Sequence, residues 1–305
     1  MKLINLIYSI IKNPVDYTID EEKVWIFKQQ IENKFPFWKD QIKNVFKRIK
    51  FDKKVLMTYI NYKKNMDGGR ITYQNYRDKI VNTKRIKGGI KFWNQNRKFL
   101  NNINKEFGIP PEIIISIIGI ETNYGNFLGN WVILNNLYTL AFNNSSKITN
   151  NKKNFFTEEL MFFLSYCINN KYTINQMFEI KGSFAGAIGL PQFMPSSIKR
   201  YAKDGDNDGK IDLFNSHFDI IKSIASYLKK KGWKKHHLII VSPKKKELVK
   251  YKMNKTIKKC KRTYILLDNK KKYIGNNFCI LKRYNNSNFY AMAVYDLGEE
   301  LRRQL

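Results

Sequence analysis

The sequence predicts a mainly α-helical protein of the α+β type that carries a small β lobe near its C-terminal end. Apolar residues recur at helical spacing along most of the chain. Between Leu238 and Tyr284, by contrast, short apolar runs alternate with Lys, Asn and Gly, as is typical of short strands. With 305 residues, of which 43% are hydrophobic, the chain is long enough to bury a sizeable core in one large domain or two modest ones.

The N-terminal part of the chain is predicted to form helices. Helical spacing extends from Asp16 to Tyr62 and is interrupted at Asp67-Gly68-Gly69. A further helix is predicted from Ile90 to Phe107, and Gly108 is predicted to end it. The first residues, MKLINLIYSIIKNP, combine a positive start with a short apolar run but lack a small-residue cleavage site and a lipid-anchor cysteine. They leave three interpretations open: a degraded export signal, an uncleaved anchor or an amphipathic helix.

One predicted helix is apolar on almost every side. It starts at Pro110-Pro111, a typical helix-start signal, and continues through the run from Ile113 to Ile120. Such a helix must be buried, and it is too short to span a membrane. Glu121 follows the run directly. Because desolvation favours the neutral acid, the pKa of this carboxyl can rise toward neutrality, which suits general acid catalysis. The alternative is that Glu121 pairs with a lysine or caps a neighbouring helix.

A segment rich in Gly and Pro follows the next helical stretch. Helical spacing returns from Leu134 to Leu164, whereas the segment from Lys181 to Ser197 cannot be a regular helix. Its glycines would let the backbone approach a ligand closely. Ser183 and Gln192 offer hydrogen-bonding groups there, and Phe184 offers a stacking face. The alternative interpretation is a tight connection without a binding role.

The segment DGDNDGKIDLFN, which begins at Asp204, has the spacing of a calcium-binding loop with a glycine at the turn. Asn215 stands where such a loop normally closes with a glutamate, and Asp219 is the nearest carboxylate that could replace it. A structural calcium ion is therefore predicted, against the alternative of a plain acidic turn. The predicted ligands are Asp204, Asp206, Asp208, the main-chain carbonyl of Lys210 and Asp219.

Short apolar runs separated by Lys, Asn and Gly predict a small β lobe with basic surfaces between Leu238 and Tyr284. They include LIIV from Leu238, TYILL from Thr263 and FCILKRY from Phe278. After them, the segment from Tyr290 to Leu301 returns to helical spacing and is predicted to pack back on the core.

The charge of the chain is strongly positive. Its 56 Lys and Arg against 25 Asp and Glu give a formal net charge of +31, which would attract polyanions. The basic residues are nevertheless spread along the whole chain, and no nucleic-acid-binding motif accompanies them. Abundant Lys, Asn and Ile with little Ala are typical of AT-rich codon usage. We therefore attribute the charge to composition and expect no nucleic-acid partner.

The cysteines and histidines do not indicate a metal or redox site. Cys167, Cys260 and Cys279 include no CxxC pair, so free, mostly buried thiols are expected, with a disulfide between Cys260 and Cys279 as the alternative. Only three histidines are present, and the adjacent pair His236-His237 lies in a lysine-rich turn. No organic cofactor is predicted.

Four segments of the chain together resemble the lytic murein transglycosylase B family. They are GIPPEIIISIIGIETNYGNFLGNW, KGSFAGAIGLPQFMPSS, the acidic loop and RYNNSNFYAMAVYDLG, in the family's order and with similar spacing. A weaker likeness near Trp93 extends upstream, so the resemblance covers most of the chain beyond Ile90. It implies a lysozyme-like helical core that cleaves the β-1,4 bond between N-acetylmuramic acid and N-acetylglucosamine in peptidoglycan. The product would carry a 1,6-anhydromuramic end.

The resemblance implies a role for each motif. Glu121 falls on the family's catalytic acid/base, with the C6 hydroxyl of the sugar as the nucleophile. Lys152 and Lys153 stand, after an insertion, where the family has a basic pair expected to meet the peptide stem. The acidic loop matches a calcium site whose last carboxylate, Asp219, comes from the following helix. The residues that match or lie in the family's cleft motifs are Tyr124, Ser183, Phe184, Gln192, Tyr284, Asn285 and Tyr290.

These inferences predict the following organisation. Residues 1–100 form additional N-terminal helices, residues 101–236 a lysozyme-like catalytic core with the calcium loop, residues 237–284 the β lobe and residues 285–305 a helix that returns to the core. The expected partner is the peptidoglycan glycan strand, bound by a monomer in the periplasm or cell envelope facing the outer membrane, with peripheral membrane association left open. The alternatives are a muramidase that admits water, a cell-wall-binding protein whose activity has decayed, and a basic polyanion binder.

Overall fold

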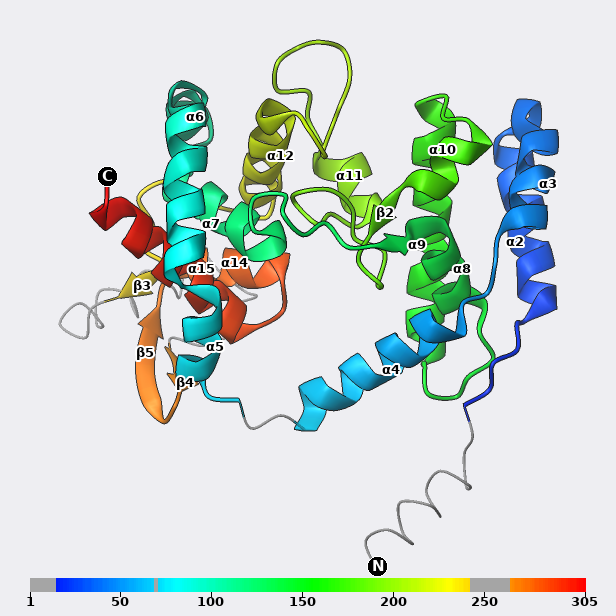
Figure 1. The fold of residues 1–305 in the computed structure, drawn as a ribbon, viewed down its shortest axis with the longest axis horizontal. Coiled ribbons are helices and arrows are strands. Elements are labelled where there is room, and N and C mark those ends of the chain that lie inside the picture. Colours follow the sequence, from blue (N-terminus) through cyan, green and yellow to red (C-terminus); the bar gives the residue numbers. More distant parts are fainter. Residues whose placement is uncertain (1–14, 69–70, 242–263) are drawn as a thin grey trace, which may run out of the picture. The chain divides into compact units, whose positions relative to one another are not determined.

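The computed structural model describes residues 15–68, 71–241 and 264–305. The N-terminal segment with its three interpretations and Cys260 both lie outside the described residues. The described chain is mostly helical with short strands, which confirms the mainly α prediction (Figure 1). It divides into two compact units. The first unit comprises the described parts of Met1–Gly69, Gly129–Ile188 and Phe193–Lys199, and the second unit those of Arg70–Leu128, Gly189–Gln192 and Arg200–Leu305.

The first unit consists of helices around an aromatic core. Asp20 caps its first helix by accepting a hydrogen bond from the main-chain N–H of Lys23 at 3.1 Å. Phe27 and Phe142 are buried, and their ring centroids lie 5.5 Å apart, so helices distant in sequence share this core. The elements are α2 (Glu21–Lys34), η1 (Pro36–Trp38), α3 (Lys39–Arg48), α4 (Lys53–Gly68), β1 (Trp131–Val132), α8 (Ile133–Phe142), α9 (Asn150–Asn169), α10 (Ile174–Glu179), β2 (Lys181–Gly182) and most of α11 (Pro195–Tyr201).

The second unit combines helices with a three-stranded antiparallel sheet of order β3-β5-β4. Asp268, in the turn between β4 and β5, accepts hydrogen bonds from the main-chain N–H groups of Tyr73 at 2.7 Å and Gln74 at 2.9 Å. The turn of the sheet thereby caps the start of α5. The elements are α5 (Tyr73–Ile80), α6 (Thr83–Phe107), α7 (Pro111–Thr122), α12 (His217–Lys230), β3 (Ile240–Val241), β4 (Tyr264–Leu267), β5 (Lys270–Ile274), α14 (Asn276–Tyr284) and α15 (Asn288–Arg303).

Helix α7 is buried along almost its whole length, as its apolar sequence predicted. Residues 113–119 are all buried, and α7 packs against α6 and α15. Asn123 follows the helix in the left-handed region with φ 48°, and its N–H reaches the carbonyl of Gly119. Glu121 therefore lies in the last turn of a rigid, tightly packed helix.

Helix α6 begins earlier than predicted. It starts at Thr83 rather than Ile90, and Asn82 caps it by accepting a hydrogen bond from the N–H of Arg85 at 3.0 Å. Glycines lower helix propensity at this turn, but the packing requires one at Gly89, where a Cβ would lie 2.5 Å from the hydroxyl oxygen of Tyr124. The predicted end is confirmed, because Gly108 has φ 70° and closes the helix.

The strands described in the β lobe are not the ones predicted, because β5 (Lys270–Ile274) was not expected and one expected strand is a helix. The runs LIIV and TYILL contain β3 and β4, but the run FCILKRY is helix α14, so that prediction is wrong. Residues 276–281 are all buried, and a run that is buried on every side shows neither strand nor helix periodicity. Packing of α14 against α15 favours the helix.

The expectation of free thiols is confirmed for one cysteine and wrong for another. Cys167 is a free, buried thiol on α9, whereas Cys279 on α14 is disulfide-bonded. Sequence spacing alone does not report the proximity that a disulfide requires.

Candidate active site

The carboxyl of Glu121 is held from one side by a tyrosine. Tyr290, in the first turn of α15, donates its hydroxyl hydrogen to Oε1 of Glu121 at 2.7 Å. No described residue donates a hydrogen bond to Oε2. One oxygen of the carboxyl is thus fixed while the other is free to exchange a proton with a ligand.

The electrostatic setting of Glu121 is that of a proton donor and acceptor near neutral pH. Burial raises the pKa of the carboxyl to about 7, while the hydrogen bond from Tyr290 acts in the opposite direction because it stabilises the carboxylate. No charged side chain among the described residues contributes to this shift. Within the described part of the chain, no second carboxylate interacts with Glu121 in the way that would push two pKa values apart.

Two further tyrosines extend the site beyond Tyr290. The ring of Tyr284 stacks on that of Tyr290, with centroids 6.3 Å apart and an interplanar angle of 12°. On its other side it meets Tyr227 of α12, with centroids 4.8 Å apart. Burial and the nearby Glu121 raise the pKa of Tyr284 and Tyr290 well above the usual range, so both hydroxyls stay protonated and act as donors.

The segment from Gly189 to Gln192 joins this arrangement through its main chain. The hydroxyl of Tyr284 donates to the carbonyl of Pro191 at 2.6 Å, and the hydroxyl of Thr122 lies 3.3 Å from the carbonyl of Leu190. Gln192 has a left-handed backbone with φ 48°. Its side-chain amide donates to the carbonyls of Gly189 at 3.0 Å and Leu128 at 3.2 Å, which leaves its Oε1 as an acceptor.

The predicted cleft residues thus fall into separate groups. The structure brings Glu121, Gln192, Tyr284 and Tyr290 together in the second unit. Asn285, just after α14, is exposed, and its carbonyl accepts a hydrogen bond from the N–H of Ser287 at 2.7 Å.

Tyr124 belongs to the second unit as well, but its ring is inserted between helices. The ring occupies a slot beside Gly88, Gly89 and Gly119, where each added Cβ would lie within 3 Å of it. Its hydroxyl is buried without a hydrogen-bond partner among the described residues. This geometry accounts for Tyr124 as a packing residue of α6 and α7, and contact with substrate stays a prediction.

Ser183 and Phe184 lie in the first unit. Ser183 closes a turn, because its hydroxyl oxygen accepts the N–H of Ala187 at 2.9 Å. Phe184 packs against Tyr62, with ring centroids 5.4 Å apart. Lys152, in the same unit, lies over the ring of Phe155 at 5.5 Å.

The acidic loop gathers three of its predicted ligands. Carboxylate oxygens of Asp204, Asp206 and Asp219 lie within 4.8 Å of one another. Asp219, on α12, is buried and accepts the N–H groups of Gly205 at 2.6 Å and Asp212 at 2.7 Å, so it is fixed by both halves of the loop. Burial raises its pKa, and the neighbouring Asp206 and Asp204 act in the same direction.

These three carboxylates suit a hard divalent cation. Oxygen donors of this kind are the ligands that calcium prefers, and a cation would remove the mutual repulsion of the three charges. Asp208 is not part of the cluster of close carboxylates, and its Oδ1 accepts the N–H of Lys210 at 2.8 Å. Its role as a ligand, like that of the Lys210 carbonyl, stays a prediction.

Two residues that support the site were missed in the sequence. Tyr227 packs on Tyr284, and the guanidinium of Arg85 donates to the carbonyl of Gly119 in the last turns of α7 at 2.9 Å. Arg85 also donates to the carbonyls of Lys79, at 3.2 Å, and Ile80, at the end of α5. No local pattern marks either residue, because both act on partners distant in sequence.

Residues 21–299 match the family described as "Transglycosylase SLT domain". The chain belongs to this transglycosylase SLT family. It is 32% identical over 300 residues to "Membrane-bound lytic murein transglycosylase B" of Escherichia coli (strain K12), a match that covers 90% of this chain and 81% of that protein. The lytic murein transglycosylase resemblance is confirmed.

Solved structures of SLT transglycosylases share the fold. The Escherichia coli lytic transglycosylase Slt35 in complex with calcium matches with a TM-score of 0.76 and 31% identity over 92% of each chain. The soluble lytic transglycosylase SltB1 of Pseudomonas aeruginosa matches with a TM-score of 0.77 and 29% identity over 92% of this chain and 99% of that one. The lysozyme-like helical class is thereby confirmed. Among the residues that the structure describes, no helix has the length and apolar content needed to cross a bilayer.

Proposed function

We propose that this SLT-family protein is a peptidoglycan lytic transglycosylase in which Glu121 acts as the single acid and base. It would cleave the β-1,4 bond between N-acetylmuramic acid and N-acetylglucosamine and leave a 1,6-anhydromuramic end. One observation carries this proposal. Glu121 has a pKa of about 7, one oxygen held by Tyr290 and no charged partner among the described residues.

In the first step, protonated Glu121 donates its proton to the glycosidic oxygen. A group with a pKa near the working pH is populated in both protonation states, so it transfers protons efficiently. The bond from the anomeric carbon to that oxygen breaks, and the N-acetylglucosamine end leaves as an alcohol. Tyr290 stabilises the carboxylate that forms, because its hydroxyl already points at Oε1.

In the second step, the Glu121 carboxylate removes the proton from the C6 hydroxyl of the muramic acid. The C6 oxygen then bonds to the anomeric carbon and closes the anhydro ring, and Glu121 is again protonated. No water enters the balance. Ordinary glycosidases use a pair of carboxylates to direct water or a covalent intermediate, whereas this scheme needs one.

We assign the saccharide-contacting roles to Gln192, Tyr284, Asn285 and Tyr290 of the second unit, and to Ser183 and Phe184 of the first unit. The acceptor Oε1 of Gln192 supports a hydrogen bond from a saccharide hydroxyl to this residue. We further propose residues 101–236 and 285–305 as the catalytic part, with 1–100 and 237–284 as additions. The action of the relatives on murein supports a site of action in the periplasm or cell envelope.

We propose that Asp204, Asp206 and Asp219 hold a structural calcium ion, with Asp208 and the Lys210 carbonyl completing the ligands. The close approach of three carboxylates supports this site, as does the similar Slt35, which was solved in complex with calcium. The ion would supply charge neutralisation that ties the loop to α12. It takes no part in the proton transfers above.

The proposal is tested with purified sacculi. Wild type and Glu121→Gln are incubated with sacculi, and soluble products are identified by mass spectrometry. Anhydromuropeptides from the wild type alone are expected. Products heavier by one water would instead indicate a muramidase, and anhydromuropeptides released by Glu121→Gln at the wild-type rate would remove Glu121 from the mechanism. Salt-sensitive binding without any product would favour a polyanion-binding protein.

A further inference from the structure

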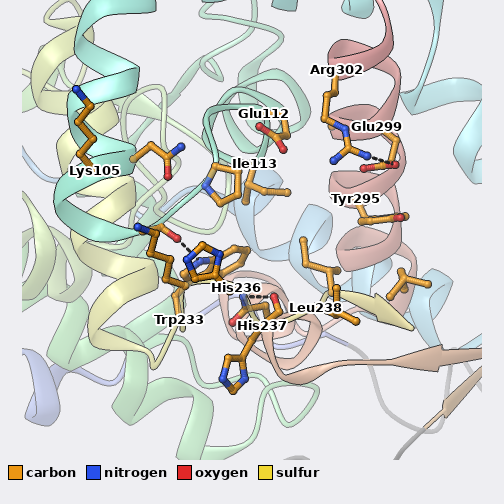
Figure 2. Close-up of a pocket in the computed structure, with 18 residues that line it drawn as sticks. Lys105, Glu112, Ile113, Trp233, His236, His237, Leu238, Tyr295, Glu299 and Arg302 are labelled. Carbon is orange, nitrogen blue, oxygen red and sulfur yellow. Dashed lines mark hydrogen bonds and ion pairs between the residues drawn. The ribbon is translucent and has the colours of Figure 1, made fainter. Parts of the chain in front are cut away.

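The second unit contains a pocket that the reaction does not use. It has a volume of about 580 Å³, within the range of small-molecule sites. Its walls come from the end of α6, the start of α7, the loop from Trp233 to Ile240 and the C-terminal half of α15. Figure 2 shows Lys105 on one side of the pocket and Glu112, Glu299 and Arg302 on the other, with His236 between them.

This pocket and the active site lie at opposite ends of the same helix pair. Glu112 is in the first turn of α7 and Glu121 in the last, which places them about 13 Å apart along the helix axis. On α15, Tyr290 contacts Glu121 near the start of the helix, whereas Tyr295 and Glu299 line the pocket further along. The pocket is therefore a separate site.

The acidic side of the pocket offers a carboxyl that forms no ion pair with a described residue. The carboxyl of Glu112 forms no ion pair or side-chain hydrogen bond with any described residue. Burial raises its pKa, Arg302 lowers it and Glu299 raises it. Glu299 differs from Glu112, because it is paired with Arg302 at 2.8 Å. The Tyr295 hydroxyl, which also lines the pocket, forms no hydrogen bond with a described residue.

The opposite side offers cations without acidic partners. Lys105 and Lys235 form no ion pair or hydrogen bond with any residue that the structure describes. Between the two sides lies a rigid apolar floor. Trp233 is buried and its indole N–H donates to the carbonyl of Gly108 at 3.0 Å, so the ring is fixed.

This distribution of charge restricts the ligand. A purely anionic ligand would meet Glu112, and a purely cationic one would meet the two lysines. We propose that the pocket binds a zwitterionic peptide segment, with an ammonium group at Glu112 and Tyr295 and a carboxylate at Lys105 and Lys235. This rests on the proposed function for its biological source, because a peptidoglycan stem carries a free ammonium group on its diamino acid and carboxylates on the neighbouring residues. The pocket residues are distinct from Lys152 and Lys153.

The test uses a stem-like peptide whose first amine is blocked. The probe is N-acetyl-L-Ala-γ-D-Glu-meso-diaminopimelate, and a second probe has the diaminopimelate amine acetylated as well. Binding to the full chain is measured by calorimetry. We expect Glu112→Gln to weaken the first probe roughly 10- to 100-fold, the range for loss of a hydrogen bond to a charged group. Acetylation should weaken binding to the wild type by a similar factor and cause little further loss in Glu112→Gln.

Two variants control the interpretation. Glu106→Gln makes the same charge change on an exposed residue of α6 outside the pocket, and should leave affinity within about twofold. Lys105→Gln, at an exposed position, should weaken the first probe but not a probe with amidated carboxylates. Equal affinity of the wild type and Glu112→Gln for the first probe would overturn the proposal. It would also be overturned if acetylation weakened binding to Glu112→Gln by the same factor as binding to the wild type, because the amine would then not bind at Glu112.

The same preparations separate this inference from the proposed reaction. A wild type that releases anhydromuropeptides but does not bind the first probe overturns the pocket assignment alone. A wild type that binds the probe with the expected dependence on Glu112 but releases no anhydromuropeptides overturns the proposed reaction alone.

Discussion

Replacing Tyr290 with phenylalanine tests how the structure sets the pKa of the catalytic group. The change removes the hydroxyl that donates to Oε1 of Glu121 at 2.7 Å and keeps the ring that stacks on Tyr284. This hydrogen bond stabilises the carboxylate, so its loss must raise the pKa of Glu121 further above about 7. A hydrogen bond to a charged group contributes about 1.5–3 kcal/mol, and about 1.4 kcal/mol corresponds to one pH unit. The pKa of Glu121 in Tyr290→Phe should therefore be about 8–9.

The assay is the pH dependence of kcat/KM for anhydromuropeptide release, which reports ionisations of the free enzyme. If Glu121 acts alone, its ionisation should produce a fall only on the alkaline side, near pH 7 in the wild type and about one to two units higher in Tyr290→Phe. Tyr284→Phe is the matched control, because its hydroxyl donates to the carbonyl of Pro191 and not to Glu121. An alkaline limb that stays in place or moves down in Tyr290→Phe would refute the reasoning.

Three further predictions concern stability and the metal. The pKa of Glu121 is raised in the folded state from 4.5 to about 7, so the free energy of unfolding of the wild type should fall by up to about 3 kcal/mol as pH rises through this window. Glu121→Gln should not show that loss. Urea unfolding with the same pH dependence for both proteins would contradict this prediction. Millimolar calcium that exceeds its Kd about 100-fold should raise the melting temperature of the wild type by roughly 4 °C over excess chelator. Asp219→Asn should lose most of this shift, and an identical shift in the variant would remove Asp219 from the site. Alanine usually stabilises a helix relative to glycine, but Gly119→Ala should lower the free energy of unfolding by roughly 1–3 kcal/mol, because its Cβ would lie 2.5 Å from the hydroxyl oxygen of Tyr124. A denaturant midpoint at or above the wild-type value would contradict this packing argument.

Features that depend on residues close together in the sequence were predicted well. The burial of α7 follows from its own isoleucines, and the position of Glu121 directly after them accounts for the raised pKa. The acidic spacing from Asp204 likewise produces a loop in which carboxylates converge. By contrast, the prediction of a strand for the run that forms α14 is wrong, because a short segment buried on all sides has no periodicity that distinguishes a strand from a helix.

The local sequence is enough to identify the group that can exchange protons, because the helix that buries Glu121 is continuous with it. The way in which that group is held depends on contacts between distant parts of the chain. Tyr290 is 169 residues from Glu121, and Tyr284 is 93 residues from the Pro191 carbonyl that it contacts. The family resemblance placed these tyrosines in a cleft motif, but it did not indicate which of them forms the hydrogen bond with the carboxyl of Glu121. The separation of Glu112 from Lys105 and Lys235 in the pocket at the start of α7 also arises from the packing of separate elements. Such contacts depend on the packing of α7, α14 and α15, which no local pattern in the chain encodes.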